Sequence, residues 1–419
     1  MDENTVPTDD TEQQALWAAA GGLEAAYLGE ELQQRSDEDR RSAVVLSAPD
    51  SSQLVRQAGL PHEVRALWVT RWDYRTPDDV RVIAERAASA NFNALFFQVR
   101  GTADAYYNSQ IEPWAARLSG GTLGQDPGWD PLAVAVSEGH ARGLEVHAWI
   151  NVYPAWLGET PPPPADPEPM WLRFNRLFGD DWVVWNRDQQ PMQLNKEYLW
   201  SNPGYWAVQE HIAAVGCDIA AHYLIDGLHL DNVRYPGWEY SRDPVTLAAV
   251  EQAQTADPTI DRKEWQRQQI DALVGFLHRS ISRLKPGLPL SAAVWPVYRN
   301  TWDWWTAGDG YEGFCQDSIG WVDAGSAQLI CPMLYLSSIT VDDMKFETLL
   351  ADFVARAGGE HVAAGIITSY NDFATIARRI DQARQAGAAG QALFSYGLIN
   401  QQGYWDALRS GPYATPAII

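Results

Sequence analysis

Eight short runs of β-forming residues alternate with stretches of helical spacing along this chain, and no other feature restricts its fold as much. Strands separated by helical crossovers favour a single parallel sheet. Eight such units predict an α/β fold, a closed TIM (β/α)8 barrel with an N-terminal extension and long loops after the strands. The expected strands are 65–70, 93–100, 145–152, 226–233, 288–295, 327–335, 361–368 and 390–397.

The rival fold is an open doubly wound sheet. Such sheets usually have fewer strands, and their dinucleotide-binding form has a GxGxxG turn, which does not follow the first run here. Residues 1–60 are acidic and polar, and we interpret them as an N-terminal extension or the tail of a missing domain. Residues 61–411 are expected to form the barrel domain. The expected helices are 78–90, 132–142, 206–222, 264–284, 346–357 and 373–386.

Charge and composition exclude several classes of partner. The net charge of -23 argues against binding to nucleic acid or to anionic membrane surfaces. No apolar run reaches the roughly 18 residues of a membrane span. The three cysteines are widely spaced, which is typical of neither a disulfide framework nor a zinc site. The N-terminus lacks the pattern of a signal peptide, so the protein is expected to be cytoplasmic, or extracytoplasmic or secreted if a leader was removed.

Tryptophan is unusually frequent, with 20 residues in the chain. Flat indole rings stack on the apolar faces of sugar rings, so a tryptophan-rich cleft indicates a carbohydrate substrate. A tryptophan-rich core is the alternative and accounts for part of the number. The segment 301–321 holds Trp302, Trp304 and Trp305, which we interpret as a candidate sugar platform. The sequence carries no signal for a particular oligomeric state.

Alternation along the strands predicts which side chains face the barrel interior. In the fourth run, Leu228 and Leu230 are expected to meet the helices, whereas His229 and Asp231 face inward. The same alternation places further polar and aromatic side chains at the interior. Because the carboxyl ends of barrel strands carry the active site, we expect these groups to converge there. The other inward residues are Gln98, Arg100, His147, Trp149, Asn151 and Trp295.

The strongest local signal is IDGLHLDNVRYPG, residues 225–237. An aspartate that ends a barrel strand can act as a nucleophile or stabilise an oxocarbenium-like transition state, and we assign this role to Asp231. Arg234 and Tyr235 follow and are expected to bind sugar hydroxyls or to tune the pKa of Asp231. A structural Asp–Arg pair that closes a loop is the alternative.

Two further carboxylates lie in loops after the first two strands. Glu112 is followed by Pro113 and Trp114, and desolvation by these neighbours would raise its pKa, as a general acid requires. An ordinary surface glutamate is the equal alternative. Asp73 is a candidate for substrate binding or for a spare acid, or is a structural residue of the first turn.

Neither a metal nor another cofactor is expected. His147 and His229 could suggest a metal site, but metallohydrolase barrels usually carry an HxH pair on the first strand, and 65–73 contains no histidine. We therefore expect the two histidines to bind substrate or to hold a carboxylate in place.

Four segments resemble the glycosyl-hydrolase-like family 10 domain, which is distinct from the xylanases that share the number. The resemblance covers about residues 63–400 and implies a TIM barrel, carbohydrate hydrolysis and an extracytoplasmic location, with bacterial cell-wall glycan as a candidate substrate. The segments are FFQVRGTADAYYNSQIEPWA, DPGWDPLAVAVSEGHARGLEVHAWINVYP, YLIDGLHLDNVRYP and WVDAGSAQLICPMLY.

The resemblance also implies site residues. The family's EPW motif falls on Glu112 to Trp114, its HAW-N motif on His147 to Asn151, and its strand-four aspartate on Asp231. The strand-six tyrosine motif ends at Tyr335. Two positions depart from the common pattern: Asn232 replaces a second aspartate, and Met333 replaces a glutamine.

Two hypotheses of different class follow. The first is a glycoside hydrolase with Glu112 as general acid/base and Asp231 as nucleophile or charge stabiliser. The second is a glycan-binding barrel without catalysis, which the changes at Asn232 and Met333 keep open. A phosphate-binding barrel enzyme would need a Gly-rich anion loop after the seventh or eighth run, and the sequence has none there.

Overall fold

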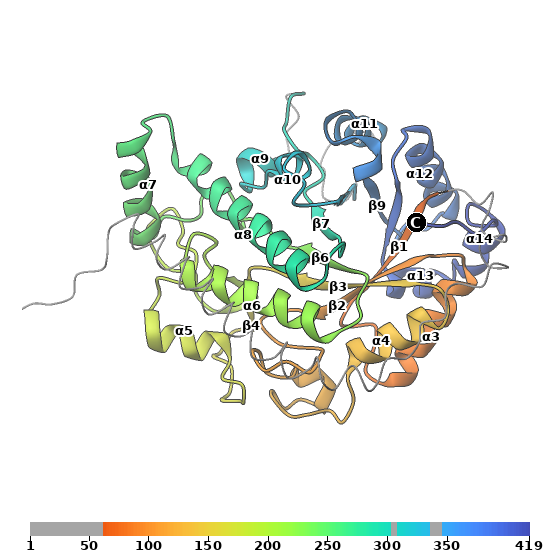
Figure 1. Ribbon diagram of the computed structural model, residues 1–419, viewed down its shortest axis with the longest axis horizontal. Helices are drawn as coiled ribbons and strands as arrows, with labels where there is room; N and C mark the ends of the chain where they lie inside the picture. The colour runs from red at the N-terminus through yellow and green to blue at the C-terminus, as the bar shows by residue number, and fades with distance from the viewer. Residues whose placement is uncertain (1–61, 303–307, 336–345) are drawn as a thin grey trace, which may run out of the picture. The chain divides into compact units, whose positions relative to one another are not determined.

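The computed structural model describes residues 62–302, 308–335 and 346–419. Its centre is one sheet of eight parallel strands in the order β8-β7-β6-β3-β2-β1-β10-β9 (Figure 1). Parallel bridges from Ile330 to Val362 and from Met333 to Gly365 join the two end strands. The sheet is thus nearly closed into a barrel, which confirms the predicted fold. The strands are β1 Val64–Val69, β2 Ala94–Arg100, β3 Glu145–Asn151, β6 Gly227–Asp231, β7 Leu290–Val294, β8 Leu329–Pro332, β9 Ala363–Ile367 and β10 Gly390–Phe394.

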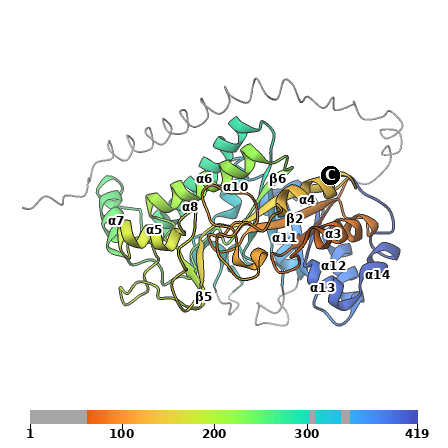
Figure 2. The ribbon, with the colours of Figure 1, turned by 90° about the horizontal axis from the view of Figure 1, so that it is seen from below.

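All six predicted helices are present between the strands. They are α3 Pro77–Ser89, α4 Pro131–His140, α6 Trp206–His222, α8 Arg262–Leu284, α11 Phe346–Ala357 and α12 Phe373–Gln385. In both ribbon views α3 lies beside the C-terminal helices, because β1 pairs with β10 (Figures 1 and 2). No helix in the described ranges is long and apolar enough to cross a membrane.

Several elements were not predicted. An antiparallel pair, β4 Pro154–Gly158 and β5 Asn195–Trp200, is inserted after β3. Helices also occupy loops, namely α5 Met170–Phe178, α7 Pro244–Ala256, α9 Gly310–Gly313, α10 Ser318–Asp323, α13 Tyr396–Gln402 and α14 Trp405–Ser410. The predictions for residues 1–60, Trp304 and Trp305 lie outside the described residues.

Short polar caps fix where several helices begin. Thr76 and Asp79 form a reciprocal capping box at the start of α3. Asp130 and Asp243 accept hydrogen bonds from the first turns of α4 and α7. Each of these three caps is followed by a proline, whose fixed φ suits the first helical position and whose missing N–H costs nothing there. The local sequence therefore determines where these three helices begin.

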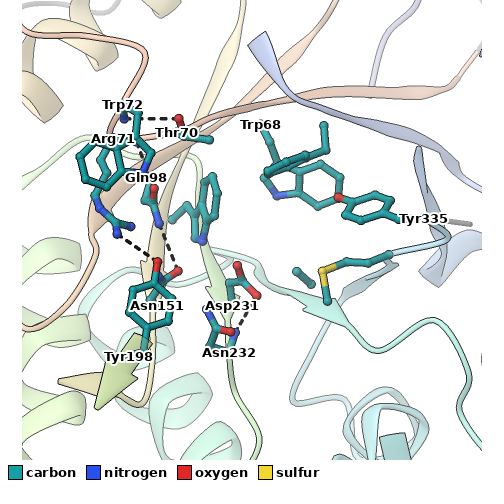
Figure 3. Close-up of a pocket in the computed structure, with 14 residues that line it drawn as sticks. Trp68, Thr70, Arg71, Trp72, Gln98, Asn151, Tyr198, Asp231, Asn232 and Tyr335 are labelled. Atoms are coloured by element: carbon teal, nitrogen blue, oxygen red, sulfur yellow. Dashed lines mark hydrogen bonds between the residues drawn. The ribbon is translucent and has the colours of Figure 1, made fainter. Parts of the chain in front are cut away.

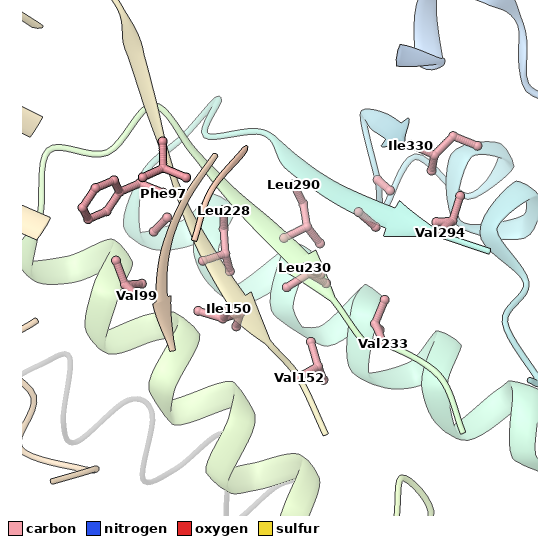
Figure 4. Close-up of a cluster of buried hydrophobic side chains, with 14 of the residues drawn as sticks. Phe97, Val99, Ile150, Val152, Leu228, Leu230, Val233, Leu290, Val294 and Ile330 are labelled. Carbon is pink, nitrogen blue, oxygen red and sulfur yellow. The ribbon is translucent and has the colours of Figure 1, made fainter. Parts of the chain in front are cut away.

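The main hydrophobic core lies between the outer face of the sheet and the helices. Phe97 and Val99 of β2, Ile150 of β3, and Leu228 and Leu230 of β6 are all buried in it (Figure 4). This arrangement confirms the predicted outward orientation of the two leucines. Burial of one such side chain contributes roughly 1.5–3 kcal/mol, so this layer supplies much of the stability of the fold.

The barrel interior holds a second, smaller apolar cluster that includes Trp68, Phe96 and Trp149. His229 lies within it, stacked on Phe96 with ring centroids 4.0 Å apart. The Trp68 indole donates to His229 Nε2 at 3.0 Å, and His229 Nδ1 pairs with the Ser291 hydroxyl at 2.8 Å. Burial holds the pKa of His229 well below its usual value, so the ring is neutral. His229 therefore supports the interior beneath the mouth.

Gly365 should be essential to the closure between β8 and β9. A Cβ at this position would lie 2.5 Å from the Pro332 carbonyl oxygen, so Gly365→Ala forces the end strands apart. We expect the free energy of unfolding to fall by about 1–3 kcal/mol, measured by urea denaturation. The matched control is Gly275→Ala in α8, where the new methyl meets only the tip of Arg279. That variant should be neutral or slightly stabilised, and equal losses in both would contradict the role of Gly365.

Candidate active site

A cavity of about 240 Å³ lies at the carboxyl ends of the barrel strands (Figure 3). Its walls come from seven barrel strands or the residues that follow them, and from β5 of the inserted pair. This is the position at which TIM barrels hold their active sites. The lining residues are Trp68, Thr70, Arg71, Trp72, Gln98, Trp149, Asn151, Tyr198, Asp231, Asn232, Ala293, Met333, Tyr335 and Phe394.

Asp231 is the only carboxylic acid among the described residues that line the cavity. It is the last residue of β6, as the alternation predicted. Burial raises the pKa of its carboxyl, and this effect outweighs the lowering by the Asn232 amide, which donates to Oδ1 at 2.6 Å, and by Arg234. A carboxyl with a raised pKa is suited to donate a proton.

Asn232 turns the chain sharply after the strand. Its φ is +53°, in the left-handed region that asparagine tolerates better than most residues. The turn lets the Asn232 amide cap the Asp231 carboxyl and brings the Asn232 side chain into the cavity wall. The departure from the family pattern at this position therefore suits the backbone conformation.

Amide side chains of β2 and β3 connect one wall of the cavity. The Gln98 Nε2 donates to Asn151 Oδ1 at 3.2 Å, and Gln98 Oε1 accepts from the Arg71 backbone N–H at 3.0 Å. The Asn151 Nδ2 donates to the Gly101 carbonyl at 3.1 Å. Each amide NH2 has a second N–H, which leaves one donor per side chain for a ligand.

Arg71, Trp72 and Tyr198 form the side of the cavity that the sequence analysis did not predict. The Arg71 guanidinium donates to the Tyr198 hydroxyl at 3.0 Å and lies 4.7 Å from the centre of the Trp72 ring. Trp72 is 54% exposed, so one large apolar surface is available at the rim. The signal for Arg71 and Trp72 was their position directly after the first strand. Tyr198 gave none, because it comes from the inserted pair.

Trp149, which was predicted to face the barrel interior, lines the cavity. Its side chain is buried, and its indole N–H is directed at the Asp231 carboxyl, whose pKa it helps to lower, although the pair does not meet the geometry of a full hydrogen bond. This donor can therefore be shared between Asp231 and a bound ligand. Trp302, a candidate for the sugar platform, packs against the main core.

Glu112 lies outside the cavity lining, in a buried ion-pair network. Its carboxylate accepts from the Arg100 guanidinium at 2.8 Å and pairs with His211 Nε2 of α6 at 2.7 Å. Although burial opposes ionisation, these two partners lower the pKa of Glu112 to about 2. The expectation that desolvation raises the pKa of Glu112 above its ordinary value is therefore wrong. A permanently ionised, enclosed carboxylate cannot act as a general acid.

Arg100 was expected inside the barrel, and the structure corrects this. The pairing between β2 and β3 shifts register between Gln98 and Arg100, which breaks the alternation. The Arg100 side chain instead donates to Glu112 and to the backbone carbonyls of Asn151 and Val152. It therefore fixes the end of β3, next to the cavity wall.

Asp73 holds the turn after β1. Its carboxylate accepts from the Thr70 backbone N–H at 2.7 Å and from the Thr70 hydroxyl at 2.9 Å. Burial raises the pKa of Asp73 despite these bonds. Of the alternatives considered for Asp73, the geometry favours the structural residue of the first turn.

The remaining predicted site residues divide between the cavity and its surroundings. Tyr335 lines the cavity, next to Phe394. His147 pairs with Glu145 at 3.0 Å, near the start of β3. Arg234 lies over the rings of Trp200, Trp295 and Phe314 at 5.0–5.3 Å, and burial lowers its pKa to about 10. Residues that were predicted at the site but do not line the cavity are Asp73, Arg100, Glu112, Trp114, His147, His229, Arg234, Tyr235 and Trp295.

Within the described ranges, no three histidine, cysteine, aspartate or glutamate side chains come together in a way that could hold a metal ion. The chemistry that this cavity can perform with its own groups is proton transfer from Asp231, with aromatic and amide contacts to orient a ligand.

The substitution Glu112→Gln should lower stability because it leaves the Arg100 guanidinium buried without its counter-ion. We expect a loss of about 3–5 kcal/mol in the free energy of unfolding at pH 7. The stabilisation by Glu112 is present above its ordinary pKa of 4.5 and is lost as the pH falls towards 2, so wild type and variant should converge in acid. Urea denaturation between pH 7 and pH 3 measures this. Glu251→Gln on the exposed face of α7 is the control, and an equal effect there would contradict the assignment.

Comparisons with known proteins agree with the fold. The chain is 27% identical over 319 residues to glycosyl hydrolase YngK of Bacillus subtilis (strain 168), covering 70% of this chain and 57% of that protein. It is 26% identical over 250 residues to glycosyl hydrolase DigH of Escherichia coli (strain K12), covering 58% and 54%. The chain thus spans little more than half the length of these relatives.

Solved structures resemble the chain at lower identity. The PgaB (BpsB) glycoside hydrolase domain from Bordetella bronchiseptica aligns with a TM-score of 0.60 at 15% identity, covering 83% of this chain and 98% of that domain. The α-L-fucosidase isoenzyme 2 from Paenibacillus thiaminolyticus aligns with a TM-score of 0.56 at 14% identity, covering 84% and 49%.

These likenesses show a TIM-barrel fold shared with glycoside hydrolases. The family model described as "Glycosyl hydrolase-like 10" matches residues 63–356. This range contains six of the eight barrel strands, all but β9 and β10, and all the lining residues but Phe394. On this match, the chain belongs to the glycosyl hydrolase-like 10 family.

Proposed function

We propose that this protein hydrolyses glycosidic bonds of a poly- or oligosaccharide, with Asp231 as the general acid that protonates the leaving oxygen. The observation that carries the proposal is a carboxyl of raised pKa at the end of a barrel strand, facing a cavity with an exposed tryptophan at its rim. Cleavage of a glycosidic bond needs a proton on the leaving oxygen, and burial that raises the pKa of the Asp231 carboxyl favours the protonated form that supplies it.

This role differs from the one expected for Asp231. Arg234 and Tyr235 were expected to keep it ionised as a nucleophile. Among the described residues, however, Arg234 makes no ion pair with Asp231, and its N–H groups bond to the Tyr235 carbonyl at 3.2 Å and to Asn232 Oδ1 at 3.4 Å. The effect of burial on Asp231 therefore dominates, which supports an acid.

The cavity has an apolar face and hydrogen-bond donors that can bind a sugar ring. Trp72 supplies an apolar face, and the second amide N–H donors of Gln98 and Asn151 can bond to hydroxyl groups. The relatives named as glycosyl hydrolases support the same class of substrate. We propose a bacterial cell-wall glycan as the candidate polymer, which would place the working protein outside the cytoplasm.

A glycan-binding barrel without catalysis is the second candidate. It is favoured by one observation, namely that the described lining contains a single carboxyl where most glycosidases use two. Glu112 does not supply the second, because it is enclosed by Arg100 and His211. Turnover of a glycan by the wild type distinguishes the two candidates.

The substitution Asp231→Asn should reduce kcat on polysaccharide by about 10²- to 10⁴-fold, the usual contribution of a general acid. Activity on aryl glycosides, whose leaving group needs little protonation, should be partly spared. For the wild type, kcat/KM should fall as the pH rises through the raised pKa of Asp231, because only the protonated form is active. This alkaline limb should be absent from the variant.

The control for this experiment is Asp406→Asn on α14, whose side chain is 89% exposed. It should retain wild-type kcat and pH dependence. Near-normal turnover by Asp231→Asn would eliminate Asp231 as the acid, and absence of turnover by the wild type on all glycans would favour the binding protein.

Replacing Trp72 by alanine should weaken glycan binding by roughly 1–3 kcal/mol, the usual contribution of a large aromatic contact. Isothermal titration calorimetry with a bound oligosaccharide measures this loss. Trp238→Ala is the matched control, since Trp238 is similarly exposed and does not line the cavity. Unchanged affinity in Trp72→Ala would exclude a stacking role for this ring.

A further inference from the structure

Arg71 is a buried cation in the cavity wall that the proposed hydrolysis does not use. Arg71 is 3% exposed, and its guanidinium donates a hydrogen bond to the neutral hydroxyl of Tyr198 at 3.0 Å. Asp104 and Asp231 are near enough to interact with its charge, although neither carboxylate forms a direct ion pair with it among the described residues. A guanidinium presents five N–H donors, so several of them are available to a ligand.

The position of this guanidinium is fixed by close packing. A Cβ on Gly101 would lie 2.7 Å from both Cδ and Nε of Arg71, so the arginine stem crosses directly over this glycine. The Arg71 backbone N–H is also held, because it donates to Gln98 Oε1 at 3.0 Å. A donor group that is already oriented loses little conformational entropy on binding a ligand.

Two more arginines lie around the same turn. The Arg117 guanidinium lies 5.0 Å from the Trp72 ring centre and donates to the backbone carbonyls of Arg71 and Trp72 at 3.1 and 2.7 Å. Burial and the nearby charge of Arg75 lower the pKa of Arg117. Three arginines therefore lie around this turn, where Asp73 interacts with Arg117 and Asp104 with Arg71.

A buried cation that no carboxylate contacts directly is costly, and a neutral sugar hydroxyl does not balance its charge. The planar fork of a guanidinium matches a carboxylate, which accepts two parallel hydrogen bonds from it. In Figure 3, Arg71, Trp72 and Tyr198 gather on one side of the cavity, and Trp68 and Tyr335 on the other, with Asp231 between them. An anionic group on Arg71 would therefore lie beside the sugar that stacks on Trp72.

We infer that the sugar bound beside Trp72 carries a carboxylate and that Arg71 selects for it. This inference rests on the proposed function in so far as the ligand is a glycan. It concerns binding, so it can be tested separately from bond cleavage.

The test measures binding by calorimetry in an Asp231→Asn background, so that no ligand is consumed. The probes are three pairs of hexasaccharides, each with a neutral and a carboxylated member: cellohexaose and its C6-oxidised form, mannohexaose and hexamannuronate, and chitohexaose with and without 3-O-lactyl ethers on alternate residues. We expect at least one carboxylated member to bind about tenfold or more tightly than its neutral partner.

Three variants identify the source of this preference. Arg71→Met keeps most of the stem and removes the charge, so the preference should disappear while the affinity for the neutral partner changes little. Arg71→Lys keeps a charge without the planar fork and should retain part of the preference. Arg75→Gln removes a positive charge from the same turn but does not line the cavity, and it should keep the full preference. Circular dichroism melting curves confirm that each variant is folded.

Each other result overturns the inference. It is wrong if neutral members bind as well as carboxylated ones, if no carboxylated member binds measurably, or if Arg71→Met retains the preference. Failure of the proposed function gives a different result. A carboxylate preference without turnover by the wild type supports the inference and rejects hydrolysis. Turnover of neutral glycans without a carboxylate preference supports hydrolysis and rejects the inference.

Discussion

The alternation of side chains along the barrel strands is the constraint on which the rest of this structure depends. In β6, Leu228 and Leu230 point to the helices and belong to the main core, whereas His229 and Asp231 point inward. These two inward residues differ in their distance from the carboxyl end of the strand. His229 is enclosed in the interior, and Asp231 reaches the cavity. One strand thereby supplies core, internal support and a functional group.

This constraint explains how much of the site could be predicted from the sequence. The eight strands and the inward positions of Gln98, Trp149, Asn151 and Asp231 follow from local periodicity, and all four residues line the cavity. Periodicity does not report depth, so His147 and His229 were also assigned to the mouth although neither lines the cavity. Nor does it report a register shift, and for that reason Arg100 was misplaced.

Contacts between distant parts of the chain account for the other errors. Glu112 was judged by its neighbours Pro113 and Trp114, but its ionisation is set by Arg100 and by His211, which lies 99 residues away. The contact between Arg71 and Tyr198 spans 127 residues and depends on the inserted strand pair. A carboxylate in such surroundings cannot be assigned as acid or base from sequence neighbours alone, because long-range charges decide its pKa.

Burial affects the two ionisable groups of the cavity wall, Asp231 and Arg71, differently. Burial raises the pKa of Asp231 and so favours its protonated form. Arg234 opposes this effect only in part, and its guanidinium also contacts three aromatic rings and donates to Asn232 Oδ1. Arg71 remains charged because a guanidinium does not lose its proton in proteins, and its pKa is raised further here. The cavity therefore combines a permanent cation with a carboxyl whose protonated form is favoured by burial, and protonation of Asp231 would remove its repulsion of an anionic sugar.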